Sequence, residues 1–327
     1  MCCLLKKKAI MKKIYAPLII ILFATSSIAQ QNFITNQYIF NPMTINPAYA
    51  GTKQWTNINM IYSAPWTGLD GAPNTQAISI EGSPISTMGL GLQLINDRIG
   101  AESRQGLWGS YSYILKLNEK FKLSMGLAAG VSYFSLDGQK LISESVDDPS
   151  IPLDRVSSIR FDPKMGFFLY SERFYAGLSV TDMLGNLLEA PDGFVAKQER
   201  HYYFTAGHVF DIGKDVKVKP SVLIREDFKA PTNFDVTTHF LFKETFWIGA
   251  SYRFGADLLS TKSLDNSLRK RDALIVMTQW NINPSLAIGY AYTHSLTALS
   301  SFAGHEIMLD YTLPRKINTK MKTPRYF

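Results

Sequence analysis

The side chains that most often carry catalysis or bind metal ions are sparse in this chain. None of the five histidines lies three to five residues from another, so no zinc-binding spacing appears. The only cysteines, Cys2 and Cys3, stand at the N-terminus. The chain has no G-x-S-x-G elbow, no P-loop and no glycine-rich dinucleotide motif opening a helix. We therefore expect a protein that is not an enzyme and that needs no metal and no cofactor.

Three charged residues within regular stretches of the sequence could still do chemistry. Arg253, Glu306 and Asp310 could form a selectivity filter or supply catalytic carboxylates. The alternative, which we favour, is that they line a wet interior and pair with one another there. A Ser-His-Asp arrangement also stays open, because such triads are defined by geometry and not by spacing.

The elements that would position these residues show a repeated pattern after about residue 50: apolar side chains alternate with small or polar ones. Residues 121–133, 216–225 and 246–254 are examples. Many such segments reach about ten residues, enough for a tilted strand to cross a bilayer, whereas soluble strands average about five or six. Aromatic residues such as Phe121 and Tyr133 end the apolar faces. A soluble sandwich would also alternate, but these two features favour lipid as the neighbour of the apolar face.

The pattern predicts an all-β fold, a transmembrane antiparallel β-barrel over residues 54–313 with about fourteen strands. Short links between the strands alternate with long polar ones along the chain, which is typical of outer-membrane barrels with short periplasmic turns and long extracellular loops. An even strand number then places both termini in the periplasm. The expected strands are 54–62, 74–82, 87–96, 105–117, 120–134, 162–170, 173–181, 202–211, 216–225, 233–242, 245–254, 272–281, 284–294 and 304–313.

The N-terminal residues have the pattern of a secretory signal peptide. Lysines precede a short apolar run over residues 16–24, and small residues lead to a cleavage site after Ala29. We expect residues 1–29 to be removed and translation to start at Met11. Removal takes away both cysteines and five lysines, so the net charge falls from +7 to about +2 (7 − 5). A mature chain with so little charge gives no reason to expect nucleic acid binding.

Two segments lie outside the predicted strands. Residues 30–53 contain Asn-Pro turn signals at 41–42 and 46–47, which predict a compact plug or lip in the periplasm beneath the barrel. Residues 314–327 form a tail with basic and no acidic side chains. This tail could dock to an acidic periplasmic partner, or it could be a flexible solvated end. Its basic residues are Arg315, Lys316, Lys320, Lys322 and Arg325.

The stretch Asn-Pro-Ala-Tyr-Ala-Gly at residues 46–51 resembles the N-terminal hallmark of the PorP/SprF family. Further similarities follow in order over nearly all of the mature chain, including the glycine-rich residues 88–91 and a closing strand at 304–309. Ala303-Gly304 replaces the Gly-Ser that usually precedes the histidine of that strand. The residues that match the family's motifs are Asn46, Pro47, Ala48, Tyr49, Ala50, Gly51, Asp97, Gly100, His305 and Glu306.

Members of this family are outer-membrane proteins of the type IX secretion and gliding machinery of the Bacteroidetes. The resemblance implies contact with outer-membrane lipid and with a secreted surface protein that carries a C-terminal type IX targeting domain. It also implies periplasmic partners from the secretion machine or from peptidoglycan-associated components. The implied function is to dock, help export or anchor that surface protein. The alternative is a passive porin or solute channel, because a ring of fourteen strands can enclose water.

Overall fold

The alternating stretches of the chain form sixteen strand segments. The protein is represented by a computed structural model, which describes residues 35–141, 152, 154–184, 199–256, 258 and 272–313. The strands are β1 (Thr56–Thr67), β2 (Asn74–Ile85), β3 (Met88–Ile99), β4 (Glu102–Lys116), β5 (Lys122–Asp137), β6 (Arg155–Phe161), β7 (Lys164–Tyr170), β8 (Phe174–Thr181), β9 (His201–His208), β10 (Phe210–Asp211), β11 (Val216–Glu226), β12 (Thr232–Phe242), β13 (Phe246–Ala256), β14 (Ala273–Asn283), β15 (Leu286–Ser295) and β16 (Ala303–Leu313).

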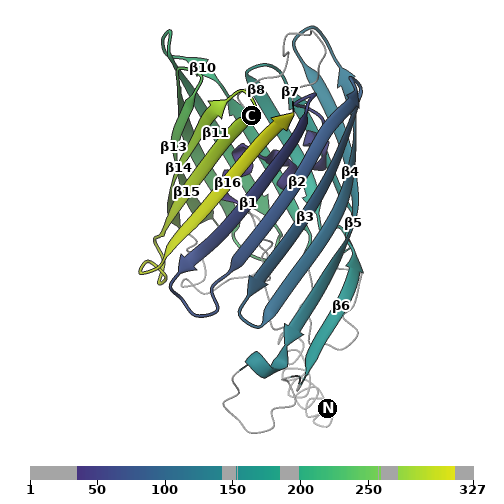
Figure 1. The fold of residues 1–327 in the computed structure, drawn as a ribbon, viewed down its shortest axis with the longest axis vertical. Coiled ribbons are helices and arrows are strands. Elements are labelled where there is room, and N and C mark those ends of the chain that lie inside the picture. The colour runs from purple at the N-terminus through teal and green to yellow at the C-terminus, as the bar shows by residue number, and fades with distance from the viewer. Residues whose placement is uncertain are drawn as a thin grey trace, which may run out of the picture.

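These segments make one closed antiparallel ring of fourteen strands (Figure 1). β1 pairs with both β16 and β2, and β9 pairs with both β8 and β11, which closes the ring. β6 and β7 both pair with β5 and act as one interrupted strand. β9 and β10 both pair with β11 and likewise act as one interrupted strand. The predicted fold class is confirmed.

The strand bounds agree with the expected ranges to within a few residues at most positions. The main difference lies in the expected loop over residues 135–161, because β5 continues to Asp137 and β6 already begins at Arg155. β6 and β7 separate at Asp162-Pro163, where the proline has no N–H to donate to a neighbouring strand. The interrupted strand is therefore longer than predicted, and its first half is β6.

The two ends of the barrel differ in the length of their links. β2 and β3 are joined by residues 86–87, whereas β5 and β6, or β8 and β9, are joined at the opposite end by long links. One link at that opposite end is also short: β3 turns into β4 at residues 100–101, with Gly100 at φ +56°, a conformation that favours glycine. β16 ends and β1 begins at the short-turn end (Figure 1). Short turns are periplasmic in outer-membrane barrels, so the long loops face outward.

The wall has an apolar outer face and a polar inner face. On β3, Leu90, Leu92 and Leu94 are exposed on the outside, while Gln93 between them is buried on the inside. Every strand side chain that points outward over the membrane-facing band must meet lipid, so this exposed apolar surface is what a bilayer requires. Among the described residues, no helix is long and apolar enough to cross a membrane.

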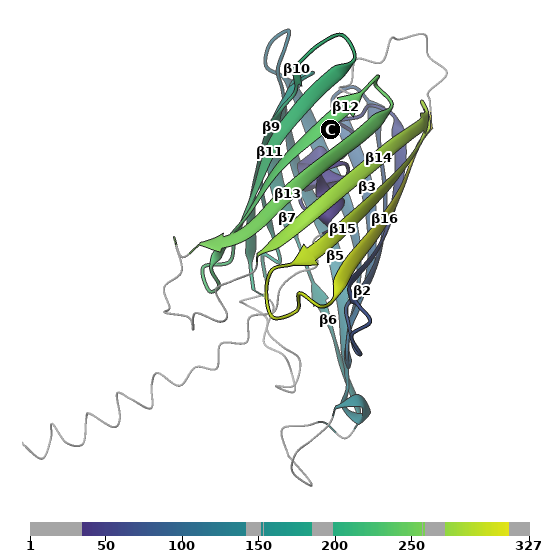
Figure 2. The same ribbon diagram turned by 90° about the vertical axis from the view of Figure 1, so that its left-hand side faces the viewer.

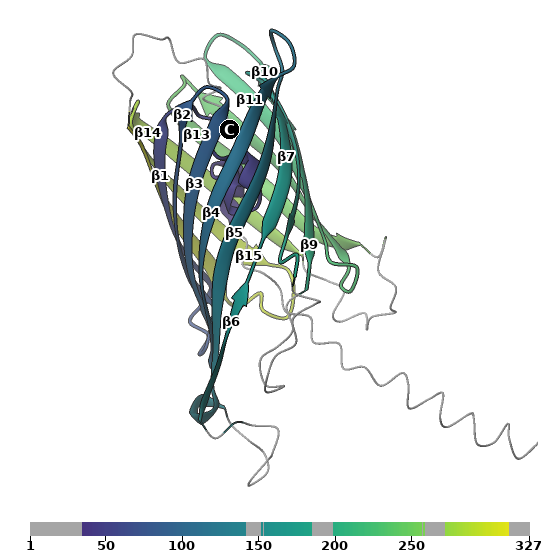
Figure 3. The same ribbon diagram turned by 90° about the vertical axis from the view of Figure 1, so that its right-hand side faces the viewer.

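Residues 35–53 lie inside the barrel, where they form a plug of three short 3₁₀-helices (Figures 2 and 3). The helices are η1 (Asn36–Ile39), η2 (Pro42–Thr44) and η3 (Pro47–Tyr49); a fourth, η4 (Gly138–Lys140), follows β5. We expected this segment beneath the barrel in the periplasm, and the structure corrects that position. The segment is rich in large apolar side chains such as Tyr38 and Phe40, which are buried only when the lumen encloses them.

Candidate functional site

The plug owes its compact path to its asparagines and prolines. Asn46 accepts a hydrogen bond on its side-chain oxygen from the Ala48 N–H at 2.9 Å, and Pro47 starts η3 with a φ suited to a helix. Pro42 starts η2 in the same position. At the other end, the Thr35 hydroxyl accepts from the Gln37 N–H at 3.0 Å. The Asn-Pro pairs are therefore turn signals, as the sequence predicts.

The first turn of the plug is held by Glu306, whose carboxylate is buried in the lumen. Glu306 accepts a hydrogen bond from the Thr35 hydroxyl, from the Asn36 N–H at 3.1 Å and from the Gln37 N–H at 2.9 Å. Arg253 donates to the Asn36 side-chain oxygen at 3.0 Å. Hydrogen bonds to a charged group are stronger than neutral ones, so these contacts fix the start of the described chain to the wall.

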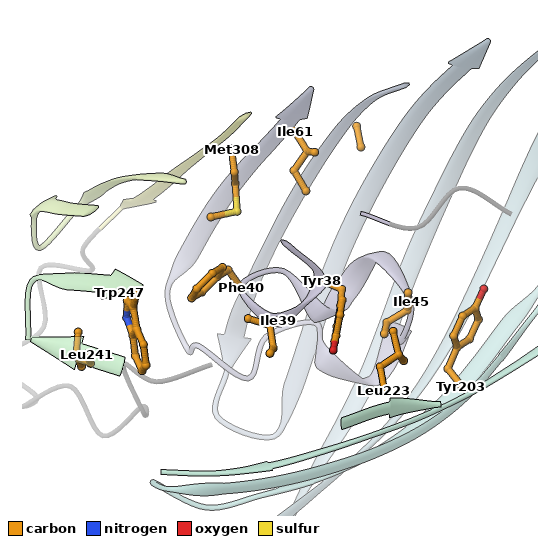
Figure 4. Close-up of a cluster of buried hydrophobic side chains, with 11 residues drawn as sticks. Tyr38, Ile39, Phe40, Ile45, Ile61, Tyr203, Leu223, Leu241, Trp247 and Met308 are labelled. Atoms are coloured by element: carbon orange, nitrogen blue, oxygen red, sulfur yellow. The ribbon is translucent and has the colours of Figure 1, made fainter. Parts of the chain in front are cut away.

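The middle of the plug packs into an aromatic cluster formed by Phe40, His239 and Trp247; Figure 4 shows Phe40 and Trp247. Trp247 lies at the start of β13, next to a short turn, so the cluster is near the periplasmic end. The Phe40 ring meets the His239 ring edge-on, with 5.2 Å between centroids, and lies 6.2 Å from the Trp247 ring. The ammonium group of the buried Lys219 lies 4.6 Å from the Trp247 ring centre and 5.0 Å from that of Phe40. A cation is attracted to the electron-rich faces of aromatic rings, so Lys219 joins the wall to the rings of Phe40 and Trp247.

The plug then crosses to the opposite wall. Asn41 donates to Asn59 at 2.9 Å and to Ser79 at 2.8 Å, on β1 and β2. Asn46 donates to the backbone oxygen of Phe167 on β7 at 3.0 Å. Because β1 and β7 stand far apart around the ring, these contacts show that the plug spans the lumen.

The last part of the plug lies directly on glycines of the wall. A methyl group at Gly126 would stand 2.3 Å from the Ala48 nitrogen, and one at Gly89 would stand 2.0 Å from the Ala50 oxygen. The backbones of plug and wall thus approach too closely for any side chain on the glycine. Ser112 donates to the Ala50 oxygen at 2.7 Å and completes this seat.

Two carboxylates of the wall contact the plug where it leaves the lumen at the short-turn end. The Gly51 N–H donates to the buried Glu81 carboxylate at 2.8 Å, and Gly51 has a φ of +75°. The Lys53 ammonium lies 3.4 Å from the Asp310 carboxylate, which also accepts from Asn57 at 2.8 Å. The chain continues directly into β1.

The motif residues singled out in the sequence fall into two groups. Residues 46–51 and Glu306 belong to the plug and its anchor. His305, next to Glu306, points to the other face of β16, and its ring lies 2.7 Å from the Tyr290 hydroxyl. Asp97 accepts from Thr75 on the neighbouring strand, away from the plug. Gly100 lies in the turn between β3 and β4.

The charged residues considered for chemistry have structural partners. Arg253 pairs with Asp235 at 2.8 Å, and Asp235 also pairs with Arg225 at 2.9 Å. Glu306 binds the first turn of the plug, and Asp310 lies beside Lys53, where the plug leaves the lumen. We expected charged residues of the interior to pair with one another, and Arg253 and Asp235 do so. Glu306 and Asp310 contact the plug segment as well. Among the described residues, no group of three His, Cys, Asp or Glu side chains could hold a metal ion.

Sequence reasoning missed the wall residues that receive the plug, such as Lys219, His239 and Gly126. The period-two pattern places them on the inner face, but it gives no sign of which plug residue each one meets. The signal peptide predicted over residues 1–29 and the basic tail over residues 314–327 lie outside the described residues.

A comparison with known protein families shows to which family this chain belongs. The sequence model of a family described as "Type IX secretion system membrane protein PorP/SprF" matches residues 27–311. The chain belongs to the PorP/SprF family. The resemblance seen in the sequence is thereby confirmed, and the match covers the plug together with almost the whole barrel. This PorP/SprF family member is an outer-membrane protein, because the family consists of type IX secretion membrane proteins and the fold is a closed transmembrane barrel.

Solved outer-membrane barrels are similar to this PorP/SprF family member in outline only. The Acinetobacter baumannii outer membrane protein Omp33 is 9% identical over 80% of this chain and 100% of its own, with a TM-score of 0.44. The P. putida toluene transporter TodX is 8% identical over 84% and 94% of the two chains, with a TM-score of 0.46. A Pseudomonas aeruginosa FadL homologue is 11% identical over 79% and 88%, with a TM-score of 0.42. No curated protein matches the chain significantly.

Proposed function

We propose that this PorP/SprF family member is a non-enzymatic docking barrel for one exported surface protein, which it helps to leave the cell or keeps attached to it. The observation that carries the proposal is the plug in the lumen. A docking protein needs a stable barrel with exposed loops and ends, and it does not need an open path through its centre.

The plug argues against the alternative, a passive porin. A porin needs a continuous water-filled channel from one end to the other. Here residues 35–53 contact β1 and β2 on one side and β7 on the other, and their aromatic cluster meets β12 and β13. The inner wall is polar, and some of its polar groups, such as Glu306 and Asn59, are bound to the plug.

The two ends of the barrel suit two kinds of partner. The long loops face outward, where an exported surface protein with a C-terminal type IX targeting domain would be met. The short turns and the exit of the plug face the periplasm, where parts of the secretion machine or peptidoglycan-associated components would be met. The apolar outer wall contacts the lipid of the outer membrane.

Deletion of the gene tests this proposal. We expect one type IX cargo protein to remain unsecreted or to be shed into the medium, while other type IX cargo proteins stay on the surface. Unchanged display of every cargo protein would contradict the proposal. Display is measured by surface labelling and mass spectrometry of whole cells and medium.

A conductance measurement separates docking from the passive channel. Purified barrel in a planar lipid bilayer is expected to stay closed, because the plug blocks the lumen. A large and steady open pore would favour the channel instead. The control is the same preparation with residues 35–50 deleted, which should conduct if the plug is what closes the barrel.

A further inference from the structure

One strand of the barrel has an edge without a described neighbour. β6 pairs with β5 over residues 155–161, and its continuation β7 pairs with both β5 and β8. β8 ends at Thr181, and its pairing with β7 stops at Met165. β6 therefore extends past β8 toward the long-loop end. It lies beside β5, its one described neighbour (Figures 1 and 3).

The register shows which backbone groups face that open edge. The Asp162 N–H donates to the Gly130 oxygen at 2.8 Å, so this pair exchanges hydrogen bonds between the strands. In an antiparallel pair, every second residue does so. The backbone groups of residues 156, 158 and 160 then face β5, and those of 155, 157, 159 and 161 face outward from the sheet. Within the described part of the chain, no strand lies there to receive them.

The side chains beside this edge are apolar and exposed. Ile159 is 74% exposed and Phe161 is 52% exposed, on the outer face of β6. Arg155, at the start of β6, forms an ion pair with Asp137 of β5 at 3.1 Å. Natural proteins usually protect such edges with lysines, prolines or a covering segment, and residues 156–161 contain neither lysine nor proline.

A hollow of about 460 Å³ adjoins the edge on the same outer face. Its lining also includes Gln76 and Arg98, which lie near the long-loop ends of β2 and β3, so the hollow extends toward the long loops. Its apolar lining includes Ile78, Leu94, Leu107, Val131, Tyr133 and Ile159.

We propose that the open edge of β6 takes up an extended strand of the exported protein. Outward backbone groups at every second residue match only a chain that is itself extended, and main-chain hydrogen bonds of this kind supply affinity in strand addition. Every second side chain of the added strand would lie on the outer face, beside Ile159 and the hollow, so the strand should alternate apolar residues with others. This inference rests on the proposed docking function and names the place and the form of the contact.

Proline at position 157 tests the hydrogen bonds. The Ser157 N–H faces the open edge, so Ser157→Pro removes a donor that no described strand of the barrel receives, and proline is tolerated at an edge. We expect display of the cargo protein to fall to the level of the gene deletion, while the amount and the heat-modifiable migration of the barrel stay unchanged. Ser157→Ala keeps the N–H and should behave as wild type.

A cross-link identifies the occupant. Ser157→Cys, in a chain in which both natural cysteines lie at positions 2 and 3, carries a thiol-reactive photocrosslinker. An adduct with the exported protein supports the proposal. Adducts only with a second copy of this chain, or only with lipid, would overturn it. Wild-type display in Ser157→Pro would also overturn it, while leaving the docking function intact if the deletion still loses display.

Discussion

The backbone N–H of Gln37 donates to the carboxylate of Glu306 at 2.9 Å, across 269 positions of sequence. One residue lies at the start of the plug and the other on β16, the last strand of the barrel. Because β16 also pairs with β1, the anchor for the plug is complete only when the ring has closed. Glu306 thus links seating of the plug to the strand that closes the barrel, as does Asp310 through its ion pair with Lys53.

Glu306→Gln should loosen the plug. Glutamine has one acceptor oxygen, and its amide group would face N–H donors that the carboxylate now binds. Leaving such donors unsatisfied costs about 1–3 kcal/mol. We expect intermittent channel openings in planar bilayers and a lower unfolding temperature in detergent. Glu119→Gln, in the exposed turn between β4 and β5, is the matched control. A silent bilayer and an unchanged unfolding temperature would contradict the role of Glu306 as anchor.

Gly126→Ala should push the plug off its seat. The added methyl group would stand 2.3 Å from the Ala48 nitrogen, so one of the two backbones has to move. The buried Met43, changed to cysteine, reports the movement through faster labelling by a soluble maleimide. Gly109→Ala is the control, because nothing lies within 4 Å of the added methyl group there. Equal labelling rates in both variants would show that the close approach does not hold the plug.

Asp235→Asn should destabilise the barrel from inside. Asp235 is buried between the guanidinium groups of Arg225 and Arg253, and its loss leaves two positive charges facing each other. Removing one partner from a buried ion pair costs about 3–5 kcal/mol. The change is measured as the shift of the urea unfolding midpoint in lipid vesicles. Asp211→Asn removes an exposed pair with Arg173, which solvent screens, and should shift the midpoint far less. Similar shifts in both variants would argue against the buried network.

Leu127→Arg tests whether lipid covers the outer face. Leu127 is 63% exposed on β5, away from the ends of the barrel. An arginine on the lipid face costs about 2–4 kcal/mol near the middle of the bilayer and about 0–1 kcal/mol near its surface. Leu117→Arg, in the short turn after β4, should therefore have little effect. Folding yields into vesicles measure both. If Leu127→Arg folds as well as Leu117→Arg, the apolar face does not contact lipid.

The strands could be predicted because their pattern is local. Alternation along β3 already places Leu90, Leu92 and Leu94 on one face and Gln93 on the other, whatever the rest of the chain does. The Asn-Pro turns of the plug are local in the same sense. The expected position of the plug was wrong because burial of Tyr38 and Phe40 depends on walls that are built from distant strands.

The amino-acid sequence alone determined the number of strands, their two faces and the difference between short and long links. Each of these features follows from residues that are neighbours in the chain, together with the need for an apolar face against lipid. Only the tertiary structure decided that Gln37 meets Glu306, that Gly126 lies under Ala48, and that β6 extends past β8. These relationships depend on the closure of the ring and on where neighbouring strands end. Contacts between residues far apart in the chain exist only once the whole barrel has formed.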